Sequence, residues 1–258
     1  MLVRNRSHGR TVLAGMQRRQ GSVDLGAYVR AIGLYARNPW LALAPLLTSL
    51  IGALLLMLVP PSNGPAGALS GGLMSLFVML LDSFGLSVSL IVAEKAWRTG
   101  HSPFDEAWTD AKRKAPDILM ATIGFNFLIY VAGLVGGFLG PIGGLVATAA
   151  AGFFFIYTIA AAAIGGIPGG AALQASIERV QRSYPIALVL GAVIILLVWL
   201  FAVVVNLVGP LVVSIPIPAP NAMLQVAEAL IKAVGLGYIA LVMAKAYDDS
   251  SISLWRQY

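Results

Sequence analysis

Long apolar blocks separated by short polar stretches dominate the chain. Charged residues, proline or glycine bound six such blocks, which run Trp40–Val59, Leu73–Ala93, Ile118–Leu139, Pro141–Ile164, Ile186–Val213 and Ala222–Tyr247. A bilayer core of about 30 Å needs about 20 apolar residues in a helix, and none of the blocks alternates as a strand would. The pattern predicts an all-α fold: a polytopic membrane helical bundle with six transmembrane helices.

The composition supports this class. Hydrophobic residues make up 59% and charged residues 11% of the 258 positions, whereas a soluble domain has about 45–50% apolar and about 25% charged residues. A water-soluble globule is therefore excluded. The chain contains no Cys, which excludes disulfides, thiolate nucleophiles and metal sites built from Cys.

Basic residues predict the orientation. Seven Arg lie in residues 1–39, five Lys or Arg in 94–116, two Arg in 165–185 and two basic residues after 244, which leaves Lys232 as the exception among 17. Cytoplasmic segments retain Lys and Arg. We therefore expect a multi-pass protein of the bacterial cytoplasmic (inner) membrane with both termini in the cytoplasm. Its basic loops fit anionic lipid headgroups, and no nucleic-acid partner is expected.

Three segments follow from this topology. Residues 1–24 form a basic cytoplasmic tail, 25–247 the transmembrane domain, and 248–258 a short cytoplasmic tail. The polar and basic N-terminus does not resemble a cleavable signal. Met16 is an alternative start, in which case residues 1–15 are dispensable.

A proline stands at the cytoplasmic mouth of each helical hairpin, at Pro39, Pro116 and Pro185. Amphipathic stretches precede the second and third prolines, at Phe104–Ala115 and Leu173–Tyr184. We expect these stretches to lie in the membrane interface as helices. Their basic residues would contact anionic lipid or a partner; they are Lys112, Arg113, Lys114, Arg179 and Arg182. Two interpretations stay open: three repeats of interfacial helix plus hairpin, or the ordinary pairing of six spans.

Five polar residues interrupt the apolar blocks and are candidate functional residues: Asp82, Asn126, Asn206, Glu228 and Lys232. Ionisable groups inside a membrane are costly and often functional. Asp82 either lines a path for ions or forms a structural hydrogen bond to Asn126, Asn206 or a hydroxyl group, and the structural role is favoured. Glu228 and Lys232, four positions apart, are expected to form an ion pair on one helix.

The sequence contains no phosphate-binding loop and no His inside an apolar block. No Lys precedes Ser or Thr as a phosphate-binding loop requires, and both His residues lie outside the apolar blocks. We therefore expect no enzymatic activity, cofactor or metal. Glycines spaced for close helix packing recur around the third and fourth blocks, at Gly133, Gly136, Gly137, Gly140 and Gly144. Such Gly-rich faces predict a protein partner or a homo-oligomer.

Residues 171–190 carry a family resemblance, with an A-x-x-x-S helix at Ala172 and Ser176, basic residues at Arg179 and Arg182, and a preceding connector containing Pro168. The pattern resembles the six-span membrane domain attached to some bacterial glycerophosphoryl diester phosphodiesterases, and related stand-alone membrane proteins of unassigned function. The phosphodiesterase domain itself is absent, so the resemblance implies a membrane module without catalysis.

Two functions remain after these exclusions. The chain is either a membrane scaffold or accessory subunit, or a small-solute or ion transporter or channel that uses Asp82. The missing catalytic chemistry and the Gly-rich faces favour the scaffold. The distinguishing observation is whether Asp82 faces a cavity or a packed interface.

Overall fold

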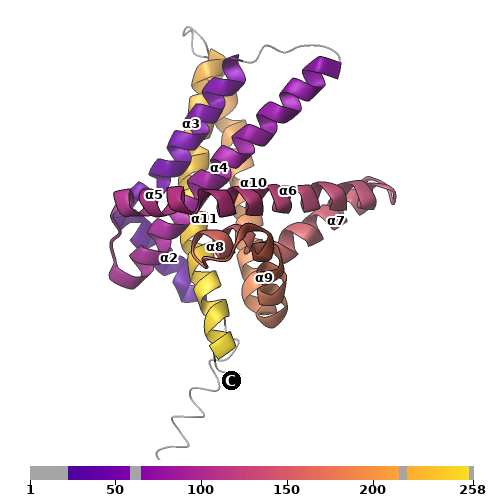
Figure 1. Ribbon diagram of the computed structural model, residues 1–258. Helices are drawn as coiled ribbons and strands as arrows, with labels where there is room; N and C mark the ends of the chain where they lie inside the picture. The colour runs from indigo at the N-terminus through magenta and orange to yellow at the C-terminus, as the bar shows by residue number, and fades with distance from the viewer. Residues whose placement is uncertain (1–22, 59–64, 215–219, 256–258) are drawn as a thin grey trace, which may run out of the picture.

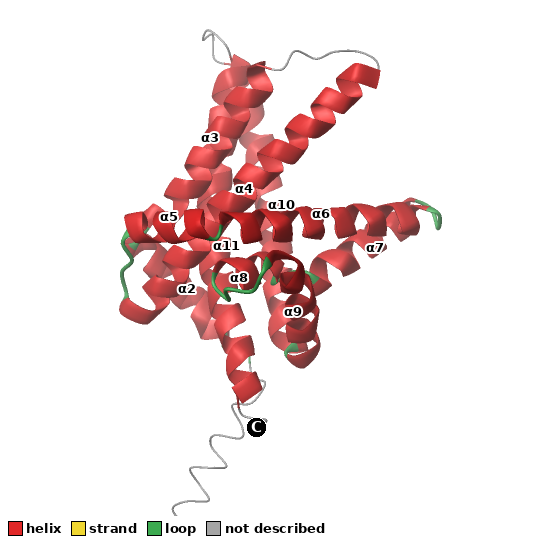
Figure 2. Cartoon of the chain, in the orientation of Figure 1, coloured by secondary structure: helices red, strands yellow, loops and turns green. Residues whose placement is uncertain are grey.

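The computed structural model describes residues 23–58, 65–214 and 220–255, and these ranges are helical with no strand (Figure 2). The predicted all-α fold is therefore confirmed. The longer helices are α3 (Leu43–Leu58), α4 (Pro65–Thr99), α6 (Ala115–Gly137), α7 (Pro141–Phe154), α10 (Tyr184–Ser214) and α11 (Pro220–Trp255). The shorter ones are α2 (Leu25–Arg37), the 3-10 helix η1 (Pro39–Ala42), α5 (Phe104–Arg113), α8 (Thr158–Ala163) and α9 (Gly169–Arg182).

Six stretches of these described residues are long and apolar enough to cross a membrane: Pro39–Met57, Ser70–Thr99, Ala115–Gly137, Pro141–Ala163, Tyr184–Leu207 and Met223–Ser250. Each overlaps one predicted block. At the C-terminal end α11 continues as a helix to Trp255, so much of the segment expected to be a tail is helical. The predicted N-terminal tail lies almost entirely outside the described residues.

The fourth block is not one continuous helix. α7 ends at Phe154 and α8 begins at Thr158. Ser176 of α9 fills this break: its hydroxyl donates to the carbonyl of Phe154 and accepts from the backbone N–H of Tyr157, each at 3.0 Å. The break is therefore satisfied by a side chain from another helix, as backbone groups in an apolar environment require.

The core consists largely of small residues around α11, which contacts α2, α3, α4 and α10. In Figure 1, α3, α10 and α11 run in similar directions, while the α6–α7 hairpin extends to one side across them. Gly237 marks a close approach of α11, because a Cβ there would lie 2.7 Å from Cε2 of Tyr35 and 3.1 Å from the carbonyl oxygen of Leu41. Small residues between membrane helices permit such short separations.

The Gly-rich pattern is used inside the α6–α7 hairpin. A Cβ at Gly136 would collide with the carbonyl oxygen of Gly143, and a Cβ at Gly133 would lie 3.0 Å from Oγ1 of Thr148. Close packing is therefore confirmed at Gly133 and Gly136, but a Cβ at Gly137 or Gly140 would meet nothing within 4 Å. At Gly136 the neighbour is the returning helix of the same hairpin.

Each hairpin is closed at one end by a side chain from the segment that precedes it. Nδ2 of Asn38 donates to the carbonyl of Gly100 at 3.1 Å, Nζ of Lys114 to that of Ala163 at 2.6 Å, and Nη1 of Arg179 to that of Tyr247 at 3.0 Å. The donor precedes its hairpin in all three cases. The acceptor follows α4 in the first case and ends α8 in the second, whereas Tyr247 lies inside α11, eight residues before its end. This shared arrangement favours three repeats over the ordinary pairing of spans.

Candidate functional site

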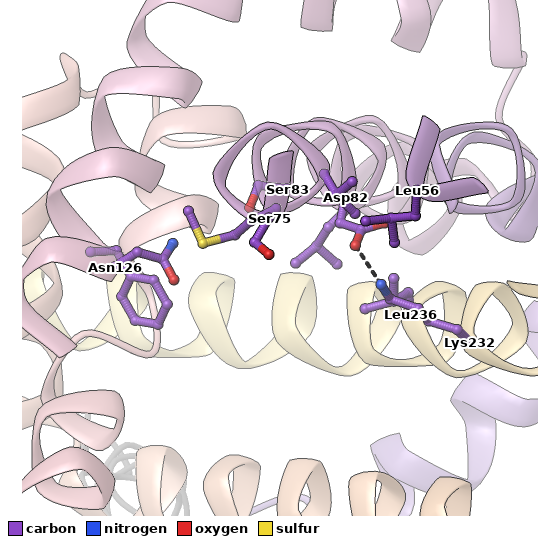
Figure 3. A pocket seen from close by; sticks show the side chains of 11 residues that line it. Leu56, Ser75, Asp82, Ser83, Asn126, Lys232 and Leu236 are labelled. Atoms are coloured by element: carbon purple, nitrogen blue, oxygen red, sulfur yellow. Dashed lines mark hydrogen bonds and ion pairs between the residues drawn. The ribbon is translucent and has the colours of Figure 1, made fainter. Parts of the chain in front are cut away.

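Asp82 and Lys232 form an ion pair between α4 and α11 (Figure 3). The other carboxylate oxygen of Asp82, Oδ1, accepts a hydrogen bond from the hydroxyl of Ser49 on α3 at 3.1 Å. One carboxylate therefore joins three helices. A hydroxyl was among the partners predicted for Asp82, but the Lys232 ammonium group was not.

The pair lies well inside the apolar spans. Asp82 lies 12 positions before Glu94, and Lys232 lies 13 positions before Lys245, the next charged residue along each helix. A helix rises about 1.5 Å per residue, so the two groups lie about 18 Å and about 20 Å from those charged residues. Half of a hydrocarbon core of about 30 Å is about 15 Å, so both charges lie well inside the predicted spans.

A cavity of about 470 Å³ adjoins the pair. It is lined by residues of α3, α4, α6 and α11: Leu56, Ser75, Val78, Met79, Asp82, Ser83, Leu86, Phe125, Asn126, Lys232 and Leu236. The side chain of Asp82 is 18% exposed and that of Lys232 39% exposed, so the ammonium group is the more accessible partner. Asp82 thus contacts both a packed interface, through Ser49, and the cavity.

Asn126 and Asn206 do not bond to Asp82. Asn126 lines the cavity toward the end away from Lys232 (Figure 3), and its Nδ2 donates to the carbonyl of Thr122 on its own helix at 2.9 Å. Nδ2 of Asn206 likewise donates to the carbonyl of Ala202, at 2.7 Å. Each amide is therefore satisfied within its own helix, which removes the two asparagines predicted as partners of Asp82.

The predicted ion pair between Glu228 and Lys232 is corrected by the structure. Lys232 pairs with Asp82, and Glu228 is not among the residues that line the cavity. An unpaired carboxylate inside an apolar span is costly, and the Lys232 ammonium group supplies the cation for Asp82. Sequence spacing detects neighbours on one helix only, so the pairing across helices was missed.

The five basic residues expected at the membrane interface divide into two groups. Lys114 is bonded to Ala163, and Arg179 lies over the ring of Tyr247, 3.7 Å from its centroid, while also donating to Oγ of Ser250 at 3.0 Å. Lys112, Arg113 and Arg182 are exposed. Only this second group is held at the surface, where Arg113 pairs with Asp110 and Arg182 with Glu178.

α5 and α9 face the protein with their apolar sides. Ala107 and Ala111 of α5 and Ala172 and Val180 of α9 are buried. Trp108 packs edge-on against Phe84, with ring centroids 5.5 Å apart. Polar residues occupy most of the outer sides. The apolar side of each helix is therefore covered by the chain itself, and mostly polar and charged groups remain for lipid headgroups or a partner.

No family model, curated protein or solved structure matches this chain. The resemblance at residues 171–190 stays a prediction. Within those residues, Ser176 is fully buried and bonds to both sides of the break between α7 and α8. The features that bear on function are therefore the Asp82–Lys232 pair, the adjoining cavity and the outer surfaces of the helices.

Proposed function

We propose that this chain is a non-catalytic scaffold or accessory subunit of the bacterial cytoplasmic membrane, with both termini in the cytoplasm. The proposal rests on one contrast: polar groups inside the spans have partners within the chain, whereas many apolar side chains are exposed. Asp82, Lys232, Asn126 and Asn206 all have partners within the chain, so their hydrogen-bonding and charge requirements are met without a substrate. The Asp82–Lys232 pair and the Ser49 hydroxyl join three helices, and the two asparagines bond within their own helices.

The apolar surface, in contrast, is left uncovered by the chain. In the 18-residue apolar stretch that represents the candidate span of α10, only 6% of the residues are buried. The corresponding value for α4 is 50%. Ile195 and Trp199, one helical turn apart, are 69% and 62% exposed. Lipid covers such surfaces by default, but a long helix with so little of its surface buried is suited to a second membrane protein or a second copy.

Site-specific photocrosslinking in native membranes tests the proposal. A benzoylphenylalanine residue at Ile195 or Trp199 should give an adduct of one defined mass, larger by a protein chain. Leu190 lies on the same helix but is fully buried, so the same probe there should give none. Monomer alone at every exposed position of α10 would contradict the scaffold.

The second candidate is a small-solute or ion transporter or channel, and the cavity beside Asp82 favours it. The cavity brings Asp82, Lys232, Asn126 and Ser75 to one space well inside the predicted spans. Polar groups around a cavity at this depth are a common arrangement in transporters. In this case the accessible Lys232 ammonium and the Asp82 carboxylate would exchange their mutual pairing for contacts with a solute.

Ion flux into proteoliposomes distinguishes the two candidates. For the scaffold, vesicles with the purified chain should hold proton, sodium, potassium and chloride gradients as well as protein-free vesicles. For an ion transporter or channel, one gradient should collapse, and the doubly neutral variant Asp82→Asn with Lys232→Gln should restore it. Asn206→Ala is the control, because Asn206 is not among the residues lining the cavity.

A further inference from the structure

α2 points an apolar stripe away from the protein. Leu25, Val29 and Ile32 are 64%, 70% and 60% exposed, while Ala27 and Ala31 on the opposite side are buried. The three exposed residues follow helical spacing and so lie on one face. α5 and α9, which hold the corresponding positions before the other hairpins, bury their apolar sides against the protein, so α2 differs from them.

The orientation of this stripe is fixed by contacts with α11. The hydroxyl of Tyr238 donates to the carbonyl of Tyr28 at 3.0 Å, and the ring of Tyr35 fills the space above Gly237. Asn38, directly after α2, bonds to Gly100. α2 is therefore attached along its length, and its outer side cannot turn inward without breaking these contacts.

α11 also gives the depth of the attachment. Tyr238 lies seven positions before Lys245, which is about 10 Å further into the apolar part of α11. Residues 233–244 carry no charge, so the contact with α2 lies among apolar turns. Arg179 of α9 contacts Tyr247 instead, which lies two positions beyond Lys245 and next to Asp248. α2 and α9 therefore sit at different levels.

We propose that α2 is an amphipathic anchor in the cytoplasmic leaflet, with lipid acyl chains as the occupant of the Leu25–Val29–Ile32 stripe. Three observations agree on lipid. The stripe is apolar and exposed, its attachment point lies among apolar turns of α11, and the chain continues from α2 into η1, where Trp40 is 50% exposed. Trp is typical of the membrane–water interface.

The charged residues of α2 fit the same position. Arg37 is exposed in the last turn, and the exposed Arg30 is neutralised by its ion pair with Asp24. A long Arg side chain can lay its stem along apolar surface and hold its guanidinium group at the level of the lipid phosphates. The stripe would then face acyl chains while Arg37 reaches an anionic headgroup.

The absence of Cys makes a direct test possible, because single-cysteine variants of the full chain need no background changes. Val29→Cys and Ile32→Cys would be labelled with a nitroxide in vesicles of phosphatidylethanolamine and phosphatidylglycerol. Oxygen, which partitions into lipid, and a water-soluble nickel chelate would then be compared as relaxing agents. Two controls set the scale: Leu54→Cys on the exposed apolar side of α3, and Thr109→Cys on the outer side of α5.

The expected result is that labels at 29 and 32 relax with oxygen more strongly than with nickel, as at 54 and opposite to 109. Preference for nickel at 29 and 32 would place the stripe in water and overturn the proposal. Protection from both agents would also overturn it, because the stripe would then be covered by protein. Size-exclusion profiles matching the parent chain establish that the variants are folded.

Discussion

Asp82 of α4 is ion-paired with Lys232 of α11, 150 positions later in the chain. The same carboxylate accepts the hydroxyl of Ser49, so it connects α3, α4 and α11 inside their apolar spans. This pairing changes the effect expected from replacing Asp82. Asp82→Asn would be mild if the partner were an amide, as the sequence suggested, but it leaves the Lys232 ammonium without its counter-ion. A damaged Asp82→Asn variant is therefore no evidence of transport by itself.

The contact between Lys114 and Ala163 should contribute measurably to stability. Lys114→Met keeps the length of the side chain and removes the hydrogen bond to the carbonyl at the end of α8. Loss of a charge-assisted bond at this partly buried site should lower the free energy of unfolding by about 1–2 kcal/mol. Lys112→Met, at an exposed position two residues away, should change it by less than about 0.5 kcal/mol.

The measurement is unfolding in detergent micelles, followed by helical circular dichroism. Equal effects of the Lys114 and Lys112 variants would mean that the closure of the second hairpin does not depend on this bond. The same comparison applies to the first hairpin through Asn38→Ala, which removes the bond to Gly100.

Gly136 and Gly137 should respond differently to the same substitution. Gly136→Ala forces a methyl group onto the carbonyl of Gly143, whereas a Cβ at Gly137 meets nothing within 4 Å. Overpacking typically costs about 1–3 kcal/mol, so Gly136→Ala should unfold more easily in detergent. Gly137→Ala should be neutral or slightly stabilising, because Ala is a better helix former. A neutral Gly136→Ala would show that α6 and α7 are not this close.

Reporter fusions test the orientation that the basic residues predict. Fusions after Asn63 and Asn221 should report an external location, and fusions within 94–117 or 165–185 a cytoplasmic one. The physical reason is that the segments predicted to be cytoplasmic hold nearly all Lys and Arg residues, which the cytoplasmic side retains. A cytoplasmic signal after Asn63 or Asn221 would contradict the six-span topology.

The spans could be predicted because each depends on a local property. A block of about 20 apolar residues has one low-energy state in a bilayer, a helix, and that holds whatever it packs against. The predicted Ile186–Val213 differs from the observed α10, Tyr184–Ser214, by two residues or fewer at each end. The break between α7 and α8 was missed because the side chain that satisfies it, Ser176, comes from another helix.

The partners of polar residues could not be predicted, because they depend on how helices meet. Spacing by four residues suggested Glu228 for Lys232, yet the nearer carboxylate across the bundle is Asp82. The same limit applies to amphipathic helices. An apolar stripe shows that a helix has two sides but not which one the protein covers, and α2 exposes the stripe that α5 and α9 bury.

The central claim, that Asp82 and Lys232 stabilise the bundle by pairing with each other, is tested most directly by a double-mutant cycle. The four proteins are the parent chain, Asp82→Asn, Lys232→Gln and the double variant, each unfolded in the same detergent. Each single variant leaves one charge unpaired inside the apolar spans, and should lose about 2–3 kcal/mol, toward the low end for a buried pair because Lys232 is partly exposed. The account predicts that the double variant is more stable than the sum of the two losses implies, by about 1–2 kcal/mol. Strictly additive losses would contradict it, because the two groups would then contribute independently of each other.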